Sequence, residues 1–264
     1  MSAVGHTGGV SRRADALRQV AVVFGSVLQV AAAGNEVARI SAENRSLVVP
    51  SGYAFSIWGP IFGLAFAYAI YQALPRNRAR PILRRTGWFV AGAYTMNGVW
   101  EIVFPARRFV LAEVIIVAGC GFAAAAYLRV VRGGPVERRD AWLVALPVGL
   151  LFGWLTAATA VSVATTLVAL GLDARGWVAA LSGAVLLLAA GLAAAWAVRA
   201  GRAGPASAWG AYAFAVLWAL VAIVVNQYDD SLVTTAAAVA AGVPVVAAVA
   251  RRPGAGRRQA ALAA

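Results

Sequence analysis

Three side chains suited to ligand binding lie in one apolar stretch, the second three residues and the third four residues after the first. Asn97, Trp100 and Glu101 share one face if this stretch is an α-helix, because side chains at those spacings lie above one another. An indole ring offers a broad apolar surface, and a few polar groups fix the orientation of a ligand. The spacing predicts a site for a large, mostly apolar molecule. Asn97 has a second explanation, which is a hydrogen bond to a neighbouring helix.

Two carboxyl groups lie inside apolar stretches of the first 170 residues, at Glu101 and Glu113. A carboxyl group in a membrane-spanning segment is a candidate for function. Both residues also lie close in sequence to Arg107 and Arg108. We therefore favour an interfacial ion-pair cluster over a buried acidic site.

The residue types needed for metal or nucleophilic chemistry are scarce. The single histidine is His6, in the polar N-terminal segment, and the single cysteine is Cys120, inside an apolar stretch. This distribution excludes His-ligated haem, histidine-based zinc sites and Ser-His catalysis. We predict no catalytic residues, no metal and no cofactor, and expect a binding protein rather than an enzyme.

The elements that must position these side chains are membrane-spanning helices. Of 264 residues, 62% are hydrophobic and 12% are charged, which leaves too little polar surface for a soluble domain of this length. The apolar stretches are continuous and reach the roughly 20 residues that a spanning helix needs. We predict an all-α, polytopic membrane helix bundle with about eight spans, near residues 16–34, 52–74, 87–104, 109–130, 141–163, 177–198, 208–227 and 231–250.

The positive charge is distributed between these stretches. The net charge is +13 and all 23 basic residues are arginines, but they form no single patch of the kind that binds nucleic acid. With eight spans, 18 arginines fall on the side of the two termini and 5 on the other side. This bias predicts a multi-pass protein of the cell membrane with both termini in the cytoplasm. The expected partners of the arginines are anionic lipid headgroups, and no nucleic acid is expected.

Three motifs in order resemble the TspO/MBR family, which includes the translocator protein and the tryptophan-rich sensory protein. The second span opens with the run from Val49 to Gly63, in which a proline precedes an aromatic-rich helix start and a tryptophan. The third span carries Asn97-Gly98-Val99-Trp100, and the fifth carries Trp154-Leu155-Thr156-Ala157-Ala158-Thr159. The chain departs from the family in the loop before the second span, which lacks the usual tryptophans, and at Ser162, where the family has an asparagine.

The resemblance implies a TspO-like five-helix bundle over residues 14–170, followed by a three-helix extension over 171–252. It implies a chamber for a tetrapyrrole such as porphyrin, or for a sterol-like molecule. From the topology, the longest external gap, residues 35–50, is expected to cover such a chamber as a lid. Porphyrin would be a ligand there and not a cofactor. The expected ligand-binding residues are Tyr53, Trp58, Asn97, Trp100, Glu101, Trp154 and Thr156. The tryptophans among them also suit ordinary helix packing.

Three functions remain open at this stage, and an enzyme that acts oxidatively on a bound porphyrin is the least favoured of them. The resemblance favours a sensor or carrier of hydrophobic ligands, whereas eight spans also suffice for a small-solute transporter. The last three spans hold no charge well inside them of the kind that ion-coupled carriers use. The alanine-rich stretches 189–195 and 236–241 permit close helix packing and a homodimer.

Overall fold

The computed structural model describes residues 4–34 and 36–251, and this part of the chain is helical with short connections. Continuous apolar stretches favour helices because a helix satisfies its own backbone hydrogen bonds within the membrane. The helices are α1 (Val4–Ala32), α2 (Glu36–Glu43), α3 (Trp58–Ala73), α4 (Pro81–Val103), α5 (Phe109–Val131), α6 (Arg138–Asp140), α7 (Leu146–Ala169), α8 (Trp177–Gly201), α9 (Ala206–Gln227) and α10 (Leu232–Ala250), with 3-10 turns η1 (Gly52–Ile57) and η2 (Pro75–Asn77) and a π turn η3 (Ala141–Ala145).

Seven stretches of the described chain are long and apolar enough to cross a membrane, which makes this a multi-pass membrane protein and confirms the predicted fold class. By length and composition they are 12–32, 52–73, 109–131, 138–169, 177–201, 206–227 and 232–250. The remaining predicted span, 87–104, falls on α4, whose hydropathy is lowered by residues such as Asn97 and Glu101. The 23 residues of α4 still measure about 34 Å at 1.5 Å per residue, enough to cross the hydrocarbon.

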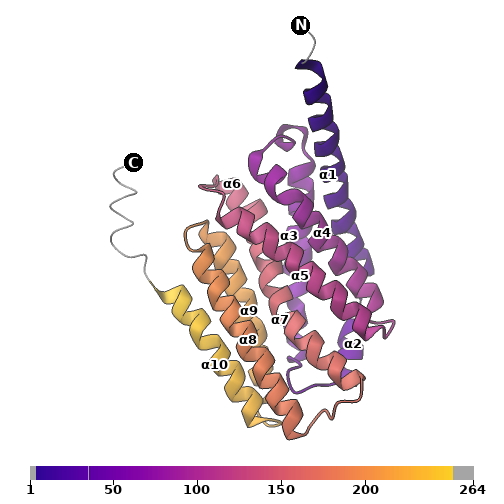
Figure 1. Cartoon of the computed structure of the whole chain (residues 1–264), viewed down its shortest axis with the longest axis vertical. Coiled ribbons are helices and arrows are strands. Elements are labelled where there is room, and N and C mark those ends of the chain that lie inside the picture. Colours follow the sequence, from indigo (N-terminus) through magenta and orange to yellow (C-terminus); the bar gives the residue numbers. More distant parts are fainter. Residues whose placement is uncertain (1–3, 35, 252–264) are drawn as a thin grey trace.

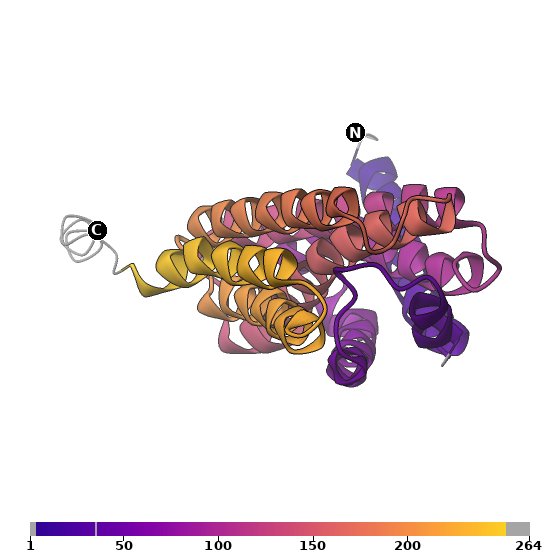
Figure 2. The ribbon, with the colours of Figure 1, turned by 90° about the horizontal axis from the view of Figure 1, so that it is seen from below.

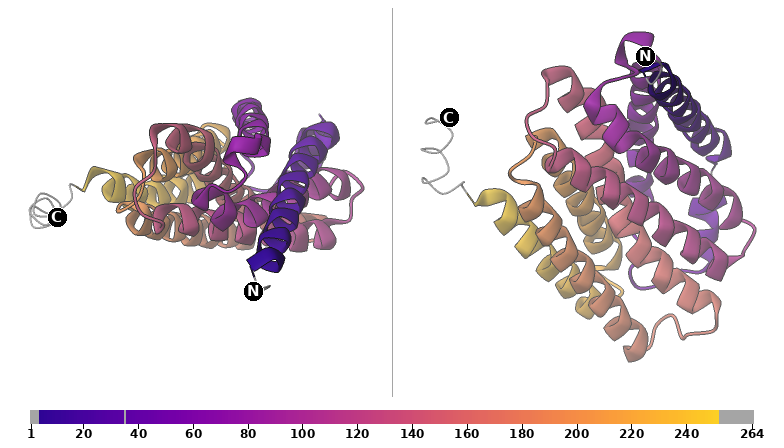
Figure 3. Two further views of the ribbon diagram at one scale, coloured as in Figure 1. Left: turned by 90° about the horizontal axis from the view of Figure 1, so that it is seen from above. Right: turned by 45° about the horizontal axis from the view of Figure 1, so that its top comes forward.

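The helices form one elongated bundle with α1 near one edge and α10 at the other (Figures 1 and 3). Viewed along the bundle, α8, α9 and α10 group together away from α1 (Figure 2). Both ends of the described chain lie toward the same end of the bundle, and α2 lies at the opposite end (Figure 1). The predicted boundary at residue 170 stays a prediction, although buried hydrophobic side chains from both parts join in a single core cluster.

Hydrogen bonds and ion pairs of arginine side chains show which connections between helices lie at the same end of the bundle. At the end of the termini, Arg85 donates to the Gly133 carbonyl at 3.2 Å and Arg202 donates to the Ala248 carbonyl at 3.0 Å. At the end of α2, Arg45 pairs with Asp230 at 3.0 Å. Arg85, Arg202 and Arg45 therefore lie at the ends that the predicted topology requires, and Arg252, Arg257 and Arg258 lie outside the described residues.

Helix α7 is the central helix of the bundle. In its most apolar 18-residue window 72% of the residues are buried, compared with 28% in α5. Glycines allow α9 to approach it closely: a Cβ at Gly149 would lie 2.1 Å from the Ala208 carbonyl oxygen, and one at Gly153 would lie 2.3 Å from the Tyr212 carbonyl oxygen. Small residues at such crossings are typical of helix packing in membranes.

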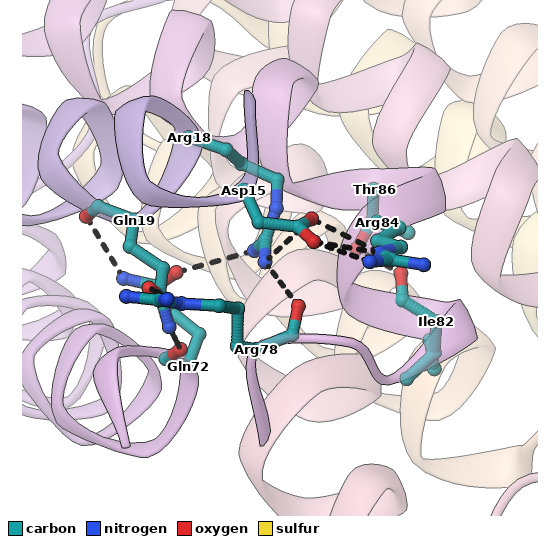
Figure 4. Close-up of polar contacts among 8 residues, drawn as sticks. All are labelled: Asp15, Arg18, Gln19, Gln72, Arg78, Ile82, Arg84 and Thr86. Atoms are coloured by element: carbon teal, nitrogen blue, oxygen red, sulfur yellow. Dashed lines mark hydrogen bonds and ion pairs between the residues drawn. The ribbon is translucent and has the colours of Figure 1, made fainter. Parts of the chain in front are cut away.

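A buried polar network joins α1, α3 and α4 at the end of the termini (Figure 4). Arg18 is almost fully buried and donates to Gln72 Oε1 at 3.2 Å and to the Arg78 carbonyl at 2.9 Å. Asp15 accepts from Arg84 Nε at 3.0 Å and lies 3.6 Å from Arg18. The carboxylate offsets the charge of two arginines, which is what allows Arg18 to be buried.

Candidate ligand-binding site

A cavity lies between α4, α7 and η1 toward the end of the bundle that holds α2, and we call it the outer chamber. Its enclosed volume is about 40 Å³, below the roughly 300–1,000 Å³ of ordinary small-molecule sites, so a large ligand requires the chamber to widen. Its wall is formed by Val37, Ser41, Pro50, Phe55, Trp100, Phe104, Trp154, Ala157, Ala158, Val161, Ser162, Thr165 and Ala219.

The α7 wall follows helical periodicity. Residues 154, 157, 158, 161, 162 and 165 all line the chamber, because positions three and four apart share one helix face. Trp154 stands at one end of this face, followed by small residues and then the hydroxyl groups of Ser162 and Thr165. The small side chains leave the space that the cavity occupies.

Aromatic rings form much of the remaining wall. Trp100 stacks on Phe104, with ring centroids 4.8 Å apart and planes inclined by 22°. Trp154 meets Phe55 edge to face at 6.2 Å and Trp58 at 5.8 Å. These contacts hold the rings in fixed orientations and present flat apolar surfaces to the chamber.

Four residues of the wall carry buried polar atoms that have no hydrogen-bond partner among the described residues. They are the indole nitrogens Nε1 of Trp100 and Trp154 and the hydroxyl oxygens of Ser162 and Thr165. An indole N–H only donates, whereas a hydroxyl donates and accepts. Because an unpaired buried polar group costs about 1–3 kcal/mol, a ligand with acceptor groups would be favoured here.

The segment expected to be a lid covers the chamber, since Val37, Ser41 and Pro50 belong to its wall. Ion pairs hold α2 in place: Glu43 pairs with Arg39 within α2 and with Arg107 in the connection from α4 to α5. Arg39 also pairs with Glu36, and the guanidinium lowers the pKa of that carboxyl below its ordinary value. Of these pairs, Glu43–Arg107 joins α2 to another element, and because it is exposed it holds the lid only weakly.

The end of the lid is fastened to α9. Gln227 Nε2 and Asn226 Nδ2 donate to the Val49 carbonyl at 3.0 and 2.8 Å, and the Ser51 amide donates to the Ala222 carbonyl at 3.0 Å. Trp218 Nε1 donates to the Ala54 carbonyl at 3.0 Å. The helices beyond residue 170 therefore help to shape the chamber.

The structure brings three of the predicted tryptophans together. Trp100 and Trp154 line the outer chamber, and Trp58 contacts Trp154 from outside it. Tyr53 is 44% exposed and meets Trp218 edge to face at 5.4 Å instead of lining the chamber.

Two predicted polar residues lie away from the outer chamber. Asn97 is 3% exposed and donates to Gln29 Oε1 on α1 at 3.2 Å. This is the hydrogen bond to a neighbouring helix that the sequence offered as the second explanation for Asn97. Thr156 donates to the Phe152 carbonyl at 2.9 Å, and its hydroxyl lies 3.3 Å from the Tyr212 hydroxyl. Sequence reasoning missed Phe55, Phe104 and Thr165 as wall residues. Thr165 lies on the same face of α7 as Trp154, and this helical spacing could have identified it from the sequence as a wall residue.

Glu101 lines a second cavity beside the outer chamber, which we call the Glu101 cavity. It shares Val37 and Phe55 with the outer chamber and also contains Trp58 and Phe62. The interfacial ion-pair cluster expected for Glu101 and Glu113 is not formed among the described residues, because Arg107 pairs with Glu43 and neither carboxyl group has an ion pair.

Comparison with known protein families matches residues 15–250 to the family described as TSPO-like protein. The match includes the last three helices as well as the five that carry the motifs. Comparisons with curated proteins and with solved structures found no match. Since the family match covers nearly the whole described bundle, the chain belongs to the TSPO-like protein family.

Proposed function

We propose that this protein binds tetrapyrrole-like or other large, flat hydrophobic molecules in the outer chamber, as a sensor or carrier in the cell membrane. The observation that carries the proposal is the pairing of aromatic walls with four buried polar groups, on Trp100, Trp154, Ser162 and Thr165, that have no hydrogen-bond partner in the described part of the chain. Stacking surface suits a flat ring system, and unpaired donors suit carboxylate or carbonyl groups at its edge.

Ligand entry is proposed to proceed past α2. This short helix covers the chamber and packs on the bundle through only a few buried residues, Val37, Ile40 and Ser41, together with the exposed Glu43–Arg107 ion pair, which is weak. A ligand that has entered the outer half of the membrane would reach the chamber when α2 moves aside.

The test is a titration of purified protein in nanodiscs with protoporphyrin IX, followed by quenching of tryptophan fluorescence. Trp154→Phe removes one chamber donor, and Trp177→Phe is its matched control because Trp177 is 78% exposed. The proposal expects saturable quenching that Trp154→Phe weakens and Trp177→Phe leaves unchanged. Linear quenching that is equal in all three proteins would contradict it.

The orientation is part of the proposal. The arginine-rich end of the bundle is placed in the cytoplasm by the positive-inside rule. A cysteine added in the connection between α3 and α4 should be protected from an impermeant thiol reagent in intact cells, and one in the connection between α7 and α8 should react. The reverse pattern would invert the topology.

Small-solute transport is the second candidate, and the buried carboxyl groups of Glu101 and Glu113 favour it. Transport predicts solute flux in proteoliposomes that Glu101→Gln abolishes. If porphyrin binding saturates and no flux is seen, the binding function alone stands.

A further inference from the structure

Glu101 is a buried carboxyl group without a counter-charge. It lies near the end of α4 and is 5% exposed. Among the described residues no hydrogen bond or ion pair reaches its oxygens. Arg39 of α2 pairs with Glu36 and Glu43, and Arg107 of the connection from α4 to α5 pairs with Glu43. A buried carboxylate without a partner is costly, so a group that supplies positive charge would be favoured beside it.

The Glu101 cavity surrounds that carboxyl group with aromatic rings. It has a volume of about 310 Å³, and Glu101 is the only charged residue in its described wall. Trp58 and Phe62 stack with centroids 5.1 Å apart and planes inclined by 18°, and Phe55 completes the aromatic side. The faces of aromatic rings attract cations, and tryptophan does so most strongly.

The chemistry of this wall selects among ligands. An unpaired buried carboxyl group is ionised only at a high cost, so an acidic or uncharged ligand gains nothing from a Glu101 carboxylate, whereas a cation stabilises it. An inorganic cation would gain little from three aromatic rings and find a single carboxylate. A cation with an apolar surface satisfies both parts of the wall.

We propose that the Glu101 cavity binds an organic ammonium group, with the Glu101 carboxylate as counter-ion and Trp58 and Phe62 as cation–π surfaces. The ammonium is either quaternary or a protonated amine. Two sources share this chemistry: the headgroup of a membrane lipid and a free organic cation. The Glu101 cavity shares Val37 and Phe55 with the outer chamber but is lined by its own carboxyl group, and the proposal does not depend on porphyrin binding.

The test measures binding of choline and of its uncharged isostere 3,3-dimethylbutan-1-ol to the protein in nanodiscs. The nanodiscs are made of digalactosyldiacylglycerol, whose headgroup has no ammonium, and binding is followed by saturation-transfer NMR. The proposal expects choline to bind at least about tenfold more tightly than the isostere. Glu101→Gln should weaken choline binding by about the same factor, while Glu101→Asp retains most of it. Equal affinities for the two probes, or an unchanged affinity in Glu101→Gln, would overturn the proposal.

Glu113→Gln is the matched control, because Glu113 is a second intramembrane carboxyl group that does not line this cavity. It should bind choline as the unaltered protein does, and a loss equal to that of Glu101→Gln would overturn the assignment. If Glu101→Gln does not fold, Trp58→Leu decides instead: it keeps the charge and removes an aromatic face, and choline binding that stays unchanged would overturn the proposal.

A parallel titration in phosphatidylcholine nanodiscs distinguishes the two sources. Weaker apparent choline binding there supports a lipid headgroup as the occupant, because the lipid competes for the site. Equal binding in both nanodiscs supports a free organic cation.

Discussion

Replacing Trp154 by phenylalanine separates a binding role for this side chain from a packing role. Trp154 is 3% exposed, contacts Phe55 and Trp58, and has no hydrogen-bond partner for its Nε1 among the described residues. Phenylalanine keeps an aromatic ring at the same place and removes the indole N–H. The substitution therefore changes packing slightly and removes one donor from the chamber.

Two opposing terms set its effect on stability. The smaller ring loses about two buried carbon atoms, which costs about 1.5 kcal/mol at roughly 0.8 kcal/mol for each. Removing a buried N–H that has no hydrogen-bond partner raises the free energy of unfolding by about 1–3 kcal/mol. The free energy of unfolding should therefore stay within about 1.5 kcal/mol of its original value.

The substitution should only weaken ligand binding, with no opposing contribution. Loss of one hydrogen bond worth about 0.5–1.5 kcal/mol weakens binding about 2- to 13-fold. Unfolding in detergent gives the stability change and the protoporphyrin titration gives the affinity change. A destabilisation greater than about 3 kcal/mol with unchanged affinity would refute the reasoning and make Trp154 a packing residue.

Three further substitutions test other parts of the structure. Gly153→Ala places a Cβ against the Tyr212 carbonyl and should destabilise the bundle by about 2 kcal/mol; an unchanged Tm would show that α7 and α9 are less closely packed. Asp15→Asn removes the carboxylate shared by Arg18 and Arg84 and should cost about 2 kcal/mol, less than a fully buried pair because Arg84 is partly exposed; denaturation that matches the unaltered protein would contradict this. Glu43→Gln frees α2 and should speed ligand release about threefold, measured by stopped-flow fluorescence, with little change in stability; an unchanged release rate would mean that α2 is not the lid.

The helices could be predicted from the sequence because the apolar stretches are continuous and separated by arginines. The predicted span 109–130 lies within one residue of α5, Phe109–Val131. The predicted first span, 16–34, lies close to the apolar stretch 12–32, whereas helix α1 itself begins earlier, at Val4, with polar first turns. Hydropathy does not report helical turns outside an apolar stretch.

The site could be predicted only in part. Trp100 and Trp154 were found because their motifs mark the chamber wall, but Asn97 was assigned to the chamber through its spacing from Trp100 and Glu101. Its direction is set by α1, which approaches so closely that a Cβ at Gly98 would lie 2.7 Å from Leu28 Cγ. Which helix packs on which face is a tertiary property that spacing along one helix does not contain.

The most direct test of the chamber is NMR of protein labelled with ¹⁵N at its nine tryptophan indoles. Signals are assigned by single Trp→Phe substitutions, and protoporphyrin IX is added to the protein in nanodiscs. The account predicts that the indole signals of Trp100 and Trp154 shift most, because their N–H groups gain acceptors, while those of the exposed Trp142 and Trp177 stay in place. Shifts confined to the exposed tryptophans would show that the porphyrin adsorbs to the surface, and would contradict the chamber as its site.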